Sequence, residues 1–222
     1  MKKKKPKSQD NILNNREIKE LKSKVLNFKE KLAIYSAIYI GMRGFEFIHI
    51  NVNWLDDIKN PTIITIPESM KCNCQRCSEI EYWHTKKDKE GKIINKILAK
   101  PKGVWKPKSI EGSRVIALQP EIQKLFKEYF KNHKSMLEMF QSRFELYRTI
   151  KRVAKRTNIK KNVSTHHLRA TNCALLNRMR TPLLDITKRL GWNSTEMALT
   201  YFKHDPESAK DVINENWKED MI

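Results

Sequence analysis

No long apolar stretch occurs in this sequence. No run approaches the roughly 20 apolar residues that an α-helix needs to cross a bilayer. The lysine cluster at residues 2–5 is not followed by the apolar segment of a secretory signal peptide. The chain has 4 cysteines, three of them crowded together, which does not suit a disulfide framework. We therefore expect a cytoplasmic protein with reduced thiols and no membrane partner.

Acidic residues are scarce relative to basic residues. The 25 Asp and Glu stand against 45 Lys and Arg, which gives a formal net charge of +20. This balance suits a polyanion, because each phosphate that a cation neutralises releases condensed counterions. Nucleic acid is the partner that the charge favours, and the alternative is a lysine-rich solvated surface. The hydrophobic content of 39% excludes a disordered chain, and the length of 222 residues suits one large domain.

The apolar pattern predicts helices on either side of a small sheet. Residues 1–13 are basic and aperiodic, which indicates a flexible arm along a phosphate backbone or a disordered tail. Helices are expected from Asn15 to about Ile48, with Arg43 at a helix boundary. Residues 62–67 and 113–118 predict two strands of an antiparallel sheet. Further helices are expected at 121–132, 145–156, 167–179, 183–190 and 196–202, and from 206 onward. The fold class is therefore α+β, mainly α-helical.

The segment between the two strands is rich in lysine and contains three cysteines and several turn-forming glycines. Such a composition is typical of an exposed, elaborated hairpin rather than of a core. We expect a hairpin insertion at about 67–104 that projects toward a partner.

Side chains suited to phosphodiester exchange gather in the C-terminal third. Exchange without a metal ion needs a nucleophile that stays attached to phosphorus, cations over the non-bridging oxygens and an acid for the departing oxygen. His166 and Arg169 are three residues apart, so both can face one phosphate from the start of a helix. Tyr201 follows Trp192 by nine residues, on a separate short helix.

Five short motifs stand in an order that resembles the tyrosine recombinases of the phage integrase family. The resemblance extends over about Asn14 to His204. Thr165 stands where the family often has proline, and Trp192 stands where histidine is commoner. The motifs are Gly41-Met42-Arg43-Gly44-Phe45-Glu46, Lys106-Pro107-Lys108-Ser109, His166-His167-Leu168-Arg169, Leu190-Gly191-Trp192, and Tyr201 itself.

The resemblance implies cationic side chains around the scissile phosphate. Arg43 and Arg169 would clamp the phosphate, because a planar guanidinium binds two oxygens and stays charged. Glu46 would orient Arg43, and the alternative is a purely structural salt bridge between them. Lys108 would protonate the leaving oxygen, although Lys106 lies too close in sequence to be separated from it.

The resemblance also implies that Tyr201 is the nucleophile. His166 would assist proton movement on the phenol, with His167 as a competitor for that role. Trp192 would donate its indole N–H to a phosphate oxygen, or it packs in the core. His204 would position the tyrosine segment, or it is a surface histidine.

The implied protein is a site-specific DNA recombinase or integrase with the DNA breaking-rejoining fold over 14–222. It would cut and rejoin double-stranded DNA through a 3′-phosphotyrosine without a cofactor, as a homotetramer on nucleoid DNA. The core-binding domain of the family is expected to be absent, because the resemblance starts with the family's catalytic domain near the beginning of the sequence. The chain would then be either a fragment of a longer protein or a minimal form. The alternatives are a type IB topoisomerase-like strand transferase and a DNA-binding module that has lost cleavage.

The cysteine cluster has the ligands of a possible structural zinc site. Cys72, Cys74 and Cys77, with His84 seven residues further on, supply three thiolates and an imidazole for tetrahedral zinc. The alternative is a group of reduced thiols without metal. Cys173 is interpreted as a small core residue.

Overall fold

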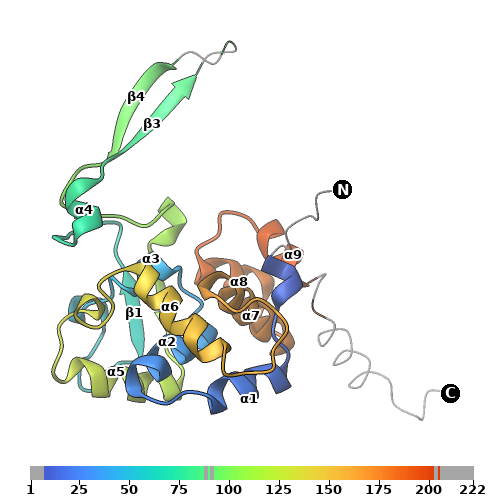
Figure 1. Ribbon diagram of the computed structural model, residues 1–222. Helices are drawn as coiled ribbons and strands as arrows, with labels where there is room; N and C mark the ends of the chain where they lie inside the picture. Colours follow the sequence, from blue (N-terminus) through green and yellow to red (C-terminus); the bar gives the residue numbers. More distant parts are fainter. Residues whose placement is uncertain (1–7, 88–89, 91–92, 203–204, 206–222) are drawn as a thin grey trace.

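The computed structural model describes residues 8–87, 90, 93–202 and 205 (Figure 1). Over residues 8–9, 82–87, 93–97 and 99 the description is of the backbone. The fold is α+β and mainly α-helical, with small antiparallel β-structure, so the predicted fold class is confirmed. In the described part of the chain, no helix is both long and apolar enough to cross a membrane.

The N-terminal region is helical, and asparagines cap its two longer helices. The Asn14 side chain accepts from the Glu17 N–H at 2.8 Å, and the Glu17 carboxylate accepts from the Asn14 N–H at 2.8 Å. Asn27 starts the second helix in a similar way, by accepting from the Glu30 N–H at 2.9 Å. The elements are η1 (Ser8–Asn11), α1 (Asn15–Ser23), α2 (Phe28–Tyr39), α3 (Gly44–Phe47) and η2 (Val52–Trp54).

The two predicted strands are confirmed as β1 (Ile63–Ile66) and β6 (Arg114–Ala117). They pair antiparallel, with Ile63 opposite Ala117 and Ile66 opposite Arg114. The strand β1 alternates as the pattern requires, since Ile64 and Ile66 are buried and Thr65 is exposed.

A nested pair of hairpins separates β1 from β6, in the place expected for the insertion. The short strands β2 (Met70–Lys71) and β5 (Val104–Trp105) pair near the body of the protein. Beyond them, β3 (Tyr82–Lys87) and β4 (Ile93–Lys100) form a second antiparallel pair, with α4 (Gln75–Glu79) at its base. Figure 1 shows β3 and β4 projecting away from the helical body. The β-structure is therefore three two-stranded sheets among the described residues, where one small sheet had been predicted.

The helices predicted after Pro120 are confirmed within a few residues. The last predicted helix, from residue 206, lies outside the described residues. The observed elements are η3 (Ile110–Gly112), α5 (Pro120–Phe130), η4 (Met136–Glu138), α6 (Arg143–Ala154), α7 (Thr165–Arg178), α8 (Leu183–Leu190) and α9 (Glu196–Phe202).

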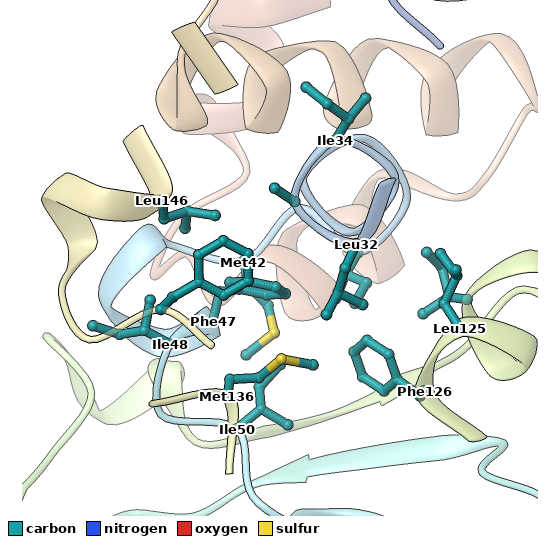
Figure 2. Close-up of a cluster of buried hydrophobic side chains, with 14 of the residues drawn as sticks. Leu32, Ile34, Met42, Phe47, Ile48, Ile50, Leu125, Phe126, Met136 and Leu146 are labelled. Atoms are coloured by element: carbon teal, nitrogen blue, oxygen red, sulfur yellow. The ribbon is translucent and has the colours of Figure 1, made fainter. Parts of the chain in front are cut away.

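Helix α2 is the centre of the core, and it packs against α5, α6 and α7. Figure 2 shows Leu32 on one side of α2, facing Met42 and Phe126, whereas Ile34 points to the other side. Leu32 and Ile34 are both fully buried, because partners cover the helix on two sides. A second cluster joins α7, α8 and α9 through residues that include Cys173, Leu190 and Trp192. Cys173 is fully buried, which fits the core role predicted for it. This second cluster holds the helix that carries Tyr201.

Candidate active site

Arg43 stands at the N-terminus of α3, after a sharp turn at Gly41. Gly41 has a φ of +70°, a conformation that side chains rarely adopt, and a Cβ there would lie 2.4 Å from the Asn172 Oδ1. The Arg43 side chain donates to the Glu46 carboxylate at 2.8 Å and to the Gly191 carbonyl at 3.2 Å. It stays 23% exposed, so its guanidinium is held from one side and is accessible from the other.

Glu46 is the buried anion around which the arginines gather. Its two carboxylate oxygens accept from Arg43 at 2.8 Å and from Arg114 at 2.9 Å. Burial would raise the pKa of Glu46, but the positive charges of Arg114, Arg169 and Arg43 lower that pKa overall. One carboxylate therefore faces three guanidinium groups, and the site keeps an excess of positive charge.

Arg169 joins the turn before α3 to the end of α8 by hydrogen bonds to backbone carbonyls. From α7 it donates to the Gly41 carbonyl at 2.6 Å, and also to the Leu190 carbonyl at the end of α8. Its guanidinium carbon lies 5.3 Å from the centre of the Trp192 ring. Burial lowers the pKa of Arg169 to about 9, and Glu46 acts in the opposite direction, so the group remains charged at neutral pH. A bound anion next to Arg169 would compensate the excess positive charge of the three guanidinium groups.

Arg114 was not among the predicted site residues. It lies on β6, with 6% of its side chain exposed, and donates to Glu46, to the Gly112 carbonyl at 2.6 Å and to the Arg189 carbonyl at 2.7 Å. The sequence contained a signal for it, because Arg114 shares the inward face of the strand with Ile116, whereas Val115 is 59% exposed. A charged residue at an inward strand position requires a buried partner.

The predicted acid and base residues lie at one edge of this cluster. His166 is on the exposed face of the first turn of α7, and Lys108 is exposed in the segment before η3. Desolvation and the charges of Arg169, Arg43 and Lys108 lower the pKa of His166, so Lys108 lies within electrostatic range of the imidazole. His167 is engaged differently, because its Nδ1 lies 2.8 Å from the Ser164 hydroxyl.

Trp192 follows the turn that ends α8. Gly191 has a φ of +61°, and the Trp192 N–H donates back to the Thr187 carbonyl at 3.1 Å, which closes the helix. The Trp192 ring stacks on Tyr201, with centroids 5.4 Å apart and an angle of 8° between the planes. Trp192 thus lies against both Arg169 and Tyr201, and it is 8% exposed.

Tyr201 is partly buried on α9. Burial raises the pKa of its phenol, Arg169 opposes the rise and Cys173 adds to it, so the phenol is protonated at neutral pH. His204, the residue predicted to position this segment, lies outside the described residues. Asp205 beside it is described, and its carboxylate binds Arg178 of α7 through contacts of 2.8 and 2.6 Å. This ion pair, which sequence reasoning missed, anchors the chain just after α9.

A separate group of potential metal ligands, the cysteine cluster, lies at the base of the hairpin. Cys72, Cys74 and Cys77 converge as predicted, but the imidazole that joins them is that of His49. The ligand atoms of the four residues all lie within 4.8 Å of one another, so the group is able to hold a metal ion. The predicted ligand His84 lies in β3, and its side chain is outside the described residues.

The arrangement around Glu46 is suited to bind a phosphodiester. Arg43 and Arg169 present positive charge from two directions, and Lys108 and His166 add groups that exchange protons. The phenol of Tyr201 lies in the same cluster, within electrostatic reach of Arg169. The residues predicted to act in catalysis or to support it, except His204, thus contribute to one site, whereas the predicted cysteine ligands belong to the separate group with His49.

Comparison with known proteins gives a consistent result. The sequence profile of the phage integrase family matches residues 10–208. The XerA recombinase structure is similar over 99% of this chain and 68% of that chain, with 15% identity and a TM-score of 0.66. The Tn1549 transposon integrase in complex with transposon right end DNA is similar over 97% of this chain and 68% of that chain, with 14% identity and a TM-score of 0.58.

A third similar structure is the XerH site-specific recombinase bound to palindromic difH substrate, in a post-cleavage complex. It is similar over 92% of this chain and 52% of that chain, with 17% identity and a TM-score of 0.54. At such identities the likeness shows the fold. No curated protein matches the sequence.

Proposed function

The chain belongs to the phage integrase family of tyrosine site-specific recombinases, and we propose that it cuts and rejoins DNA strands through a 3′-phosphotyrosine on Tyr201. The observation that carries the proposal is the stacking of Tyr201 on Trp192, whose ring also lies against the guanidinium of Arg169. This contact supports the proposal because the phenol of Tyr201 then lies beside a ring that also contacts a cation, and that cation would bind the scissile phosphate.

Double-stranded DNA is the proposed substrate. The net charge of +20 supports a polyanionic partner. The Tn1549 integrase and XerH structures, which share the fold, contain DNA. We further propose a homotetramer on nucleoid DNA, in which residues 14–222 form the catalytic domain, 67–104 its hairpin insertion and 1–13 a basic arm.

The cleavage step assigns one task to each side chain. The Tyr201 oxygen attacks phosphorus, the bond to the 5′ oxygen breaks, and Arg43 and Arg169 neutralise the non-bridging oxygens. The phenolic proton passes to His166, which is neutral at neutral pH because its pKa is lowered. The departing oxygen takes a proton from Lys108.

Rejoining reverses these steps on another strand. A 5′-hydroxyl attacks the phosphotyrosine and returns its proton to Lys108, while Tyr201 leaves with the proton that His166 gives back. The covalent ester conserves the energy of the broken bond, so no energy-supplying cofactor is needed.

The test is incubation with a nicked suicide duplex, which loses the short 5′-hydroxyl fragment after cleavage and so traps the intermediate. A denaturing gel should show a covalent protein–DNA adduct with the wild-type protein. Tyr201→Phe should bind the same duplex without forming the adduct, because only the phenolic oxygen is lost. An adduct of undiminished yield from Tyr201→Phe would eliminate this nucleophile. Binding by the wild type without an adduct would favour a DNA-binding module.

A further inference from the structure

Four potential metal ligands from two distant parts of the chain meet at the base of the hairpin. Cys72 follows β2, Cys74 caps α4, Cys77 lies within α4, and His49 comes from the turn after α3. The His49 Nε2 lies 3.3 Å from the Cys74 Sγ and 3.7 Å from the Cys77 Sγ. In a tetrahedral zinc site with bonds of about 2.0 Å to nitrogen and about 2.3 Å to sulfur, the two ligand atoms lie about 3.5 Å apart. These separations therefore match those of zinc ligands.

The orientation of the His49 ring is set by the backbone. Its Nδ1 lies 2.7 Å from the Phe45 carbonyl oxygen, and a carbonyl can only accept, so Nδ1 carries the proton. In the neutral imidazole the lone pair is consequently on Nε2, the atom that faces the thiols. A metal-binding histidine usually donates its second N–H to a carbonyl or carboxylate in this way.

Most of the cluster is withdrawn from solvent and packs against aromatic side chains. His49 and Cys77 are fully buried, and Cys72 is 9% exposed. The imidazole packs against Phe45, with ring centroids 4.4 Å apart, and against Trp105, with ring centroids 5.7 Å apart. Burying thiols and an imidazole removes their hydrogen bonds to water, which costs free energy unless another partner replaces those bonds. A metal ion would be such a partner, and an apolar shell would limit the access of solvent to it.

The backbone already holds the thiol-bearing segment in place. The Cys72 N–H donates to the Gly103 carbonyl at 2.9 Å, and the Gly103 N–H donates to the Cys77 carbonyl at 2.8 Å. Gly103 has a φ of +72°, a backbone conformation that favours glycine at this connection. The segment carrying the cysteines is therefore fixed to the start of β5, next to Trp105.

We propose that His49 Nε2 and the sulfurs of Cys72, Cys74 and Cys77 bind one zinc ion in a closed, structural tetrahedral site. All four positions are filled by protein, so the ion would have no open position for substrate. The site would join the base of the β3–β4 hairpin to α3, the helix that begins at Arg43. In Figure 1 the β3–β4 hairpin leaves the body next to α4, the helix that carries Cys77. Zinc would thereby fix the hairpin relative to the arginine cluster, whether or not the protein cleaves DNA.

The first test is the metal content of wild-type protein purified under reducing conditions without chelator. We expect one zinc ion per chain, and replacement by cobalt(II) should give the intense visible bands of tetrahedral cobalt with a thiolate charge-transfer band. Reduced protein that contains no zinc and takes up none when one equivalent is added would overturn the proposal. A native disulfide among the three cysteines would overturn it as well.

The second test separates His49 from His84. His84→Ala should retain one zinc ion, and Cys173→Ser should do the same, because this buried cysteine lies outside the cluster. His49→Ala should lose affinity by more than the roughly 10–100-fold that removal of an outer partner costs, since a ligand is lost. Zinc loss in His84→Ala with retention in His49→Ala would refute the ligand set.

A measurement on the wild type covers the case in which His49→Ala does not fold. Long-range proton–nitrogen spectra of the imidazoles should show one histidine with a protonated Nδ1 whose Nε2 resonance shifts when zinc is removed. The absence of any zinc-dependent histidine would contradict the assignment. Zinc removal should also speed amide hydrogen exchange in β2, α3 and α4 and leave the exchange rates of α5 unchanged. The same change in exchange rate in all four elements would contradict the proposal that zinc fixes the hairpin to α3.

Discussion

Replacing Glu46 by glutamine tests whether one buried carboxylate holds the arginine cluster together. The wild-type carboxylate is 3% exposed and accepts charge-assisted hydrogen bonds from Arg43 at 2.8 Å and Arg114 at 2.9 Å. The Arg169 charge stabilises it further. Glutamine keeps one acceptor, removes the charge and turns an N–H₂ group toward a guanidinium. Breaking a buried ion pair in this manner costs about 3–5 kcal/mol of unfolding free energy.

The assay is urea unfolding at pH 7, with Glu121→Gln as the matched control. Glu121 is 54% exposed and lies 3.6 Å from Lys22, so its loss should cost no more than about 1 kcal/mol. Added sulfate or duplex DNA should restore part of the stability of Glu46→Gln, because an anion replaces the missing charge. A loss in Glu46→Gln no larger than in the control would refute this account of the cluster.

The pH dependence of Glu46→Gln has a defined sign. The folded-state pKa of Glu46 is lowered, so its stabilising effect is complete above the unfolded value of about 4.3 and is lost as the pH falls through the folded pKa. The stability difference between the wild type and Glu46→Gln should hence be constant from pH 7 to about pH 5. It should shrink only in more acidic solution. A difference that vanishes near neutral pH would contradict the lowered pKa.

Two further substitutions test the chemistry and the backbone of the site. Lys108→Ala should cleave normal DNA slowly but approach wild-type rates when the bridging 5′ oxygen is replaced by sulfur, because a thiolate leaves without a proton. Rescue of Lys106→Ala in place of Lys108→Ala, in the same gel assay, would transfer the acid role to Lys106. Gly41→Ala should lower the unfolding free energy by about 1–3 kcal/mol, since it combines a positive φ with a 2.4 Å approach to Asn172. Gly103→Ala has a similar φ of +72° and open space, so an equal loss there would show that strain alone is responsible.

Local chemistry determined much of what the sequence could predict. The caps at Asn14 and Asn27, the alternation in β1 and the glycine turn before Arg43 are decided by residues next to one another in the chain. The helices at 183–190 and 196–202 are observed with the bounds predicted, because their signals lie in their own few residues. The motif order likewise indicated the family before any distance was known.

Contacts between distant segments were decided by the tertiary structure. Arg114 meets Glu46 across 68 positions of sequence, and no spacing rule connects a strand residue with the start of a helix so far away. Tertiary contacts also bring His49 to the three cysteines, where the sequence had predicted His84. His84 lies near Cys77 in sequence but on β3, in which each residue advances the chain by about 3.3 Å. His49 is 28 positions from Cys77, yet packing of α3 against the base of the hairpin places its Nε2 3.7 Å from the sulfur. The sequence thus determined which kinds of side chain are present, and folding determined which of them meet.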